Sequence, residues 1–151
     1  MRAYMVIIDE TEEALVALRF AARRAAKTRG NIHLVAMVPK PQFSAFAVVQ
    51  ATIEDEARSR AETLLTAATG NLLAEGALMP IISVRQGKAV KVVREYLIEN
   101  PEVSALVLGA AVEGGPGRLV AHFTGSGAGQ LACPVFVVPG SLSEADIERL
   151  S

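Results

Sequence analysis

The sequence predicts an α/β fold, a single doubly wound five-stranded parallel sheet with helices on both faces. Five short apolar runs alternate with stretches of helical periodicity, which is the pattern of a parallel sheet with crossover helices. The length of 151 residues fits one domain, and a 51% apolar composition supplies enough material for its core. We expect this domain to span residues 1–139, followed by a C-terminal tail, residues 140–151, that carries a short helix.

The first half of the chain predicts two strands and two helices. The apolar run Tyr4–Ile8 reads as a strand buried on both faces. Thr11 is a candidate N-cap for a helix with one apolar face, which Gly30 should end. Ile32–Val38 predicts the second strand, and a long second helix is expected from Val48 to Glu75.

The second half predicts three more strands, Ile81–Val84, Ser104–Leu108 and Pro134–Val138. A third helix lies between the first two of them. It should stop at Asn100-Pro101, because proline lacks an N–H group and restricts the residue before it.

Two further helices are expected. The fourth should begin at Gly125–Ser126, inside the glycine-rich stretch that follows the fourth strand. Ser143 with Asp146 resembles the cap of the C-terminal helix.

Composition narrows the class of function. Fifteen basic against sixteen acidic residues leave a net charge of −1, which argues against nucleic acid as a partner. The single cysteine, Cys133, points to a reducing compartment, and no apolar run is long enough to span a membrane. We therefore expect a cytoplasmic protein with no membrane partner.

Motifs for chemistry are missing from the sequence. Neither GxxxxGK[ST] nor a GxGxxG after the first strand is present, so a Walker-type loop and a dinucleotide fold are not expected. His122 has no further ligand type at metal-binding spacing. No nucleophile–base pair or paired carboxylates suggest catalysis, so we do not expect an enzyme.

A ligand site is expected at the carboxyl ends of the strands, where strand order reverses. Asp9 ends the first strand, and Gly109 ends the fourth and opens the glycine-dense stretch, so the two share one crevice if these strands are neighbours. Glycine amides and a helix start at Gly125–Ser126 would favour phosphate, with Arg118 adding positive charge. Alternatively, the glycines only make turns and Asp9 only caps a helix.

The sequence resembles the universal stress protein family over nearly the whole chain, to about Pro139. The strand ending in Gly109, the nine residues between Gly115 and Gly125-Ser126, and Cys133-Pro134-Val135 follow the family's order, as does the leading strand that ends in Asp9. The loop between the first two glycines is three residues longer than in the family pattern.

This resemblance implies a sheet of order 3-2-1-4-5, of the adenine nucleotide alpha hydrolase-like type. It implies binding of ATP, or of ADP or AMP, between strands one and four, with Mg²⁺ as a candidate companion of the phosphates. It also implies a homodimer through residues 135–138. The expected nucleotide-binding residues are Asp9, Met37, Leu108, Gly109, Gly115, Gly117, Arg118, Gly125, Ser126 and Gly127.

The leading interpretation is thus a nucleotide-binding regulator of the stress response that acts on an unknown protein partner and hydrolyses ATP slowly at most. A nucleotide-free dimeric interaction protein of the same fold is the alternative, because the apolar strand 135–138 would invite pairing at an open sheet edge. An enzyme on a related fold has no catalytic cluster behind it. Phe43 and Phe46 either cover a sheet edge or form a lid or partner surface over the crevice.

Overall fold

A computed structural model describes residues 2–39 and 47–151 of the chain, so Phe43 and Phe46 lie outside the described residues. The strands are β1 (Ala3–Ile7), β2 (Asn31–Val38), β3 (Ile81–Gln86), β4 (Val103–Ala110) and β5 (Val135–Pro139). The helices are α1 (Glu12–Thr28), α2 (Ala47–Ala74), α3 (Ala89–Glu99), α4 (Arg118–Thr124) and α5 (Glu144–Leu150), with a short 3₁₀ helix, η1 (Ala128–Gln130).

The five strands form one parallel sheet in the order β3-β2-β1-β4-β5, which confirms the predicted topology. Val6 of β1 lies beside Val107 of β4, so these two strands are neighbours. The chain leaves β1 toward β2 on one side and joins β4 on the other, which places the reversal of strand order between β1 and β4. Asp9 and Gly109 therefore lie at the same edge of the sheet.

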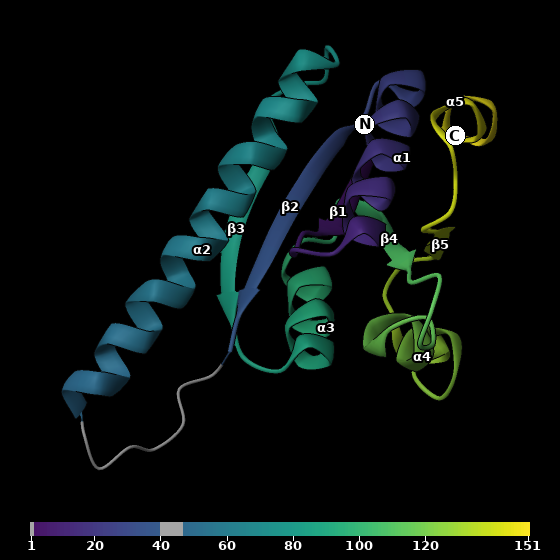
Figure 1. The fold of residues 1–151 in the computed structure, drawn as a ribbon. Helices are drawn as coiled ribbons and strands as arrows, with labels where there is room; N and C mark the ends of the chain where they lie inside the picture. Colours follow the sequence, from purple (N-terminus) through teal and green to yellow (C-terminus); the bar gives the residue numbers. More distant parts are fainter. Residues whose placement is uncertain (1, 40–46) are drawn as a thin grey trace.

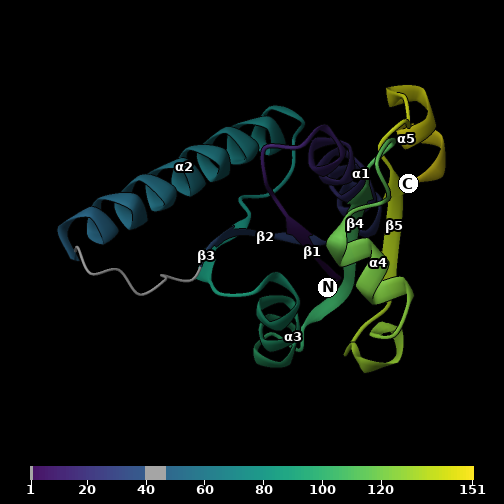
Figure 2. The same ribbon diagram turned by 60° about the horizontal axis from the view of Figure 1, so that its bottom comes forward.

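Helices cover both faces of the sheet (Figures 1 and 2). A hydrophobic core fills the space between the helices and the sheet on each face. Tyr4 and Val6 of β1 point into the core formed with α1, α2 and α5, whereas Met5 points into the core formed with α3 and α4. The alternation follows from the two-residue period of a strand. Because both faces are covered, the strands read as continuous apolar runs.

α1 ends just before Gly30, as predicted, but the glycine is not the residue that takes the left-handed conformation. Arg29, not a glycine, takes the left-handed conformation at the C-cap, with φ of 53°. Gly30 is required for another reason, since a Cβ there would lie 2.4 Å from the carbonyl oxygen of Arg2. The glycine therefore allows the chain to pass close to the N-terminal segment as it enters β2.

The prediction that a fourth helix begins at Gly125–Ser126 is wrong, because α4 ends where that helix was expected to start. Val120 and Phe123, three residues apart on one face of α4, are buried in the second core and anchor this helix. The glycine-rich residues after it carry no large apolar side chain, and only the three residues of η1 form a helical turn there.

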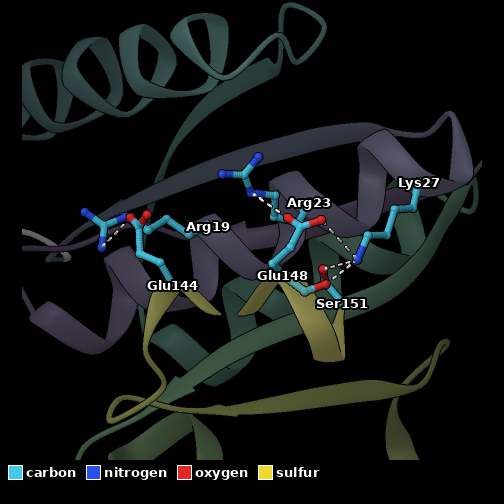
Figure 3. A network of polar contacts seen from close by, with 6 residues as sticks. All are labelled: Arg19, Arg23, Lys27, Glu144, Glu148 and Ser151. Atoms are coloured by element: carbon cyan, nitrogen blue, oxygen red, sulfur yellow. Dashed lines mark hydrogen bonds and ion pairs between the residues drawn. The ribbon is translucent and has the colours of Figure 1, made fainter. Parts of the chain in front are cut away.

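The tail folds back on its own chain. Ser143 and Asp146 form the predicted capping box, and Ile147 is buried against α1. Figure 3 shows the charged contacts around this apolar anchor, in which Glu148 faces Arg23 at 3.4 Å and Lys27 at 3.8 Å. The C-terminal helix is thus docked on α1.

His33 of β2 is a buried polar residue, with 1% of its surface exposed. Its Nδ1 lies 2.7 Å from the hydroxyl group of Tyr96, and its Nε2 lies 3.7 Å from Glu102. Burial lowers the pKa of His33, and the nearby Glu102 carboxylate opposes this shift.

Among the helices in the described ranges, none has the length and apolarity needed to cross a membrane.

Candidate functional site

Two adjoining hollows open at the carboxyl ends of β1, β2 and β4, and Asp9 and Thr11 line both of them. The larger, of about 330 Å³, lies between the ends of β1 and β2 and the helix α2. It is lined by Ile8, Asp9, Glu10, Thr11, Ala36, Met37, Pro39, Ala57, Arg60, Ala61 and Leu64. The smaller, of about 110 Å³, lies between the ends of β1 and β4 and is lined by Ile7, Asp9, Thr11, Glu13, Ala14, Leu108, Gly109 and residues 116–120.

Asp9 has a structural partner at the wall between the hollows. Its Oδ1 accepts hydrogen bonds from both the backbone N–H group of Thr11, at 2.9 Å, and the hydroxyl group of Thr11. The Thr11 hydroxyl oxygen in turn accepts from the N–H group of Ala14 and caps α1. A carboxylate has about four lone-pair sites, so Asp9 can brace this cap and still accept from a ligand.

Gly109 is needed for the close approach of α1 to β4. A Cβ at Gly109 would lie 2.1 Å from the carbonyl oxygen of Glu13, and one at Gly140 would lie 3.1 Å from the Cβ of Glu13. Glu13, in the first turn of α1, therefore packs directly against both glycines. Glu13 is also one of the residues that line the smaller hollow.

The longer glycine loop folds back on the end of β4. The N–H group of Ala111 donates to the carbonyl oxygen of Pro116 at 3.3 Å. Gly114, Gly115 and Gly117 all have positive φ, at 74°, 90° and 99°, a conformation that glycine adopts without strain. Pro116 and Gly117 thereby reach the smaller hollow, whereas Gly115 does not line it.

The segment Gly125–Gly127 lies at the C-terminal end of α4 and lines neither hollow. The N–H groups of Gly125 and Gly127 both donate to the carbonyl oxygen of His122, at 3.2 and 2.9 Å. The ring of His122 lies against Gly127, where an added Cβ would come within 2.3 Å of Nε2. These amides cap the C-terminal end of α4. At a helix start they would have been free to donate to a ligand in the crevice, but here they donate within the protein.

The structure thus brings together six of the ten residues expected from the sequence and leaves four elsewhere. Asp9, Met37, Leu108, Gly109, Gly117 and Arg118 line the two hollows. Gly115, Gly125, Ser126 and Gly127 do not.

Sequence reasoning did not single out Thr11, Glu13 or Arg60 as residues of the site. Thr11 and Glu13 follow Asp9 within one helical turn, so their spacing could have placed them at the same edge. Arg60 comes from α2, and only the packing of that helix against β2 brings it to the larger hollow. The described lining residues include three carboxylates, Asp9, Glu10 and Glu13, and two guanidinium groups, Arg60 and Arg118. Within residues 2–39 and 47–151, no cluster of three or more His, Cys, Asp or Glu side chains could hold a metal ion.

Comparison with known families agrees with this architecture. Residues 1–139 match the model of the family described as "Universal stress protein family". No curated protein sequence matches the chain significantly.

Solved structures of low sequence identity share the fold. Universal stress protein UspA from Lactobacillus plantarum is 16% identical with a TM-score of 0.74, over 91% of this chain and 97% of that one. A universal stress protein in complex with cAMP is 21% identical with a TM-score of 0.63, over 93% and 98% of the two chains. The universal stress protein from Archaeoglobus fulgidus in complex with dAMP is 19% identical with a TM-score of 0.62, over 91% and 97%.

Proposed function

This chain belongs to the universal stress protein family, and from that premise we propose that it binds an adenine nucleotide at the carboxyl ends of β1, β2 and β4. The observation that carries the proposal is the pair of adjoining hollows that meet at Asp9, where strand order reverses. Two proteins of the same fold are described in complex with cAMP and dAMP, which supports adenine as the base.

The larger hollow suits the base. It offers an apolar wall from Ala36, Met37 and Leu64 and lies beside the end of β2, where backbone groups can recognise an adenine edge. Asp9 stands between the hollows and can accept from the hydroxyl groups of a ribose. The smaller hollow, with Arg118 on its rim, would then receive phosphate. ATP, ADP and AMP share the base and the ribose, and all are candidates for this arrangement.

We propose that the bound nucleotide regulates a protein partner in the cytoplasm during stress and that turnover is slow or absent. The side chains lining the two hollows include carboxylates, guanidinium groups and Thr11, whose hydroxyl group is engaged in the helix cap. Because none of the described clusters could hold a metal on its own, Mg²⁺ would enter only as a companion of the nucleotide phosphates.

The decisive experiment measures adenosine binding by calorimetry and looks for nucleotide released when the purified protein is denatured. Asp9→Asn keeps the oxygen that accepts from Thr11 but removes the charge, and it should weaken adenosine binding at least tenfold, about 1.4 kcal/mol. Asp55→Asn changes the same group on an exposed part of α2 that lines neither hollow and should leave binding unchanged. Absence of binding by adenosine and every adenine nucleotide at millimolar concentration would refute the proposal.

A second candidate function, a dimeric interaction module, is favoured by β5. This strand lies at the edge of the sheet, and Val137 is 39% exposed on it. An apolar edge strand with unpaired backbone groups invites pairing with a second chain, so we propose a homodimer through residues 135–138. Val137→Lys should convert a dimer to a monomer in sedimentation experiments, and a wild-type chain that is monomeric at high concentration would exclude this assembly.

A further inference from the structure

We propose that this site takes adenine nucleotides with one phosphate, open or cyclic, and discriminates against ATP. The inference rests on the proposed function, because it assigns the number of phosphates at the same site. Three observations carry it: the hydrogen bonds that Gly125 and Gly127 make outside the crevice, the size of the smaller hollow, and the charged residues that line it.

Two of the amides expected to hold a chain of phosphates, those of Gly125 and Gly127, already donate hydrogen bonds within the protein. Gly125 and Gly127 both donate to the carbonyl oxygen of His122, and Ala128 donates to the carbonyl oxygen of Gly125 at 3.2 Å. A phosphate could recruit these donors only by unfolding the end of α4, which would leave the His122 carbonyl without its partners. The residues that line the crevice therefore lack the polyphosphate cradle that the sequence pattern predicts.

The space beside Gly109 is also short. The smaller hollow of about 110 Å³ is a third of the volume of its neighbour, about 330 Å³. Pro116 and Gly117 line it, and the hydrogen bond from the N–H group of Ala111 to the carbonyl oxygen of Pro116 holds this part of the wall in place. Pro116 has no N–H group to donate to an anion. We expect a hollow of this volume to take one phosphate and not a chain of three.

The charged residues of the smaller hollow favour one phosphate over several. The smaller hollow is lined by two carboxylates, Asp9 and Glu13, and among its described lining residues Arg118 is the one cation. A phosphate monoester carries about −1.5 to −2 charge at neutral pH, and each added phosphate brings further negative charge. One phosphate can pair with the Arg118 guanidinium, whereas a second and a third would face the carboxylates without a partner.

Calorimetry at one pH and salt concentration, with adenosine, AMP, cAMP, ATP and ATP with Mg²⁺ as ligands, tests this assignment. AMP or cAMP should bind at least tenfold more tightly than both ATP forms and more tightly than adenosine. The order of AMP and cAMP identifies whether the open or the cyclic form is preferred. Glu13→Gln removes one repelling charge and should reduce the ratio of the dissociation constants of ATP and AMP severalfold. Glu12→Gln alters a residue of the same helical turn that lines neither hollow, and it should leave this ratio unchanged.

Each other outcome counts against the inference in a distinguishable way. ATP binding as tight as AMP would overturn the single-phosphate assignment while supporting adenine nucleotide binding at this site. If Glu13→Gln leaves the ratio of the ATP and AMP dissociation constants unchanged, the electrostatic basis of the preference for one phosphate is wrong. If adenosine and all the nucleotides fail to bind, the proposed function falls and the inference falls with it.

Discussion

Replacing Gly109 with alanine tests the contact on which the candidate site is built. The added Cβ would lie 2.1 Å from the carbonyl oxygen and 2.5 Å from the carbonyl carbon of Glu13. Both are backbone atoms of α1, so no side chain can rotate away to relieve the overlap. Carbon and oxygen in contact lie about 3.4 Å apart, and α1 must therefore retreat from β4 by roughly 1 Å.

The expected loss of stability follows from two opposing terms. Overpacking of a close-packed interior costs about 1–3 kcal/mol, and the upper part of that range applies because the overlap is with backbone. Gly109 has no positive φ, so alanine can adopt its conformation and returns about 0.4–1 kcal/mol by restricting the unfolded chain. The net loss should be about 2 kcal/mol. For a chain of 151 residues this corresponds to a fall in Tm of about 4–8 °C.

Urea unfolding followed by circular dichroism measures this loss, with calorimetry of adenosine binding alongside it. The midpoint should fall without a change in slope, and adenosine should bind more weakly because Thr11 and Asp9 move with α1. Gly129→Ala is the matched control, since a Cβ there meets no atom within 4 Å, and its stability should stay within about 0.5 kcal/mol of wild type. A Gly109→Ala variant as stable as wild type would show that α1 is not held against β4 in this way.

Three further substitutions probe other parts of the fold by the same unfolding measurement. Burial lowers the pKa of His33, so its contribution to the free energy of unfolding should be complete above about pH 6.5 and should be lost as the pH falls toward the lowered pKa. His33→Gln should therefore lose less stability than wild type on acidification. Identical plots of stability against pH for the two proteins would contradict this. Ile147→Ala should lower the free energy of unfolding by about 2–4 kcal/mol, because Ile147 is buried. Glu148→Gln, at an exposed ion pair, should lower it by less than about 1 kcal/mol. The opposite ranking would mean that charge rather than burial docks α5. Gly70→Ala, at an open position inside α2, should stabilise the protein by about 0.5–1 kcal/mol, and a loss would point to a contact at this position that the structure lacks.

The elements whose residues alternate or repeat regularly were predicted well, because their period alone identifies them. All five strands lie within two residues of the predicted bounds at each end, and α2 runs from Ala47 to Ala74 against the expected Val48 to Glu75. The cap at Thr11 and the capping box at Ser143 were predicted because the side chains that form them act within one helical turn. The bounds of the fourth helix were missed, since glycines suggested a helix start where Val120 and Phe123 had already formed the helix.

The sequence by itself determined the strand and helix alternation, the family pattern and the arrival of Asp9 and Gly109 at strand ends, because each of these depends on residues close together in the chain. The strand order was implied by the family resemblance alone, and the tertiary structure confirmed it by placing β1 beside β4. Only the tertiary structure decided that Glu13 and Arg60 enter the site, and that the amides of Gly125 and Gly127 donate to the carbonyl oxygen of His122. Such outcomes depend on which helix packs against which strand, and on where each hydrogen-bond donor finds its acceptor. Both are settled by packing across the whole chain.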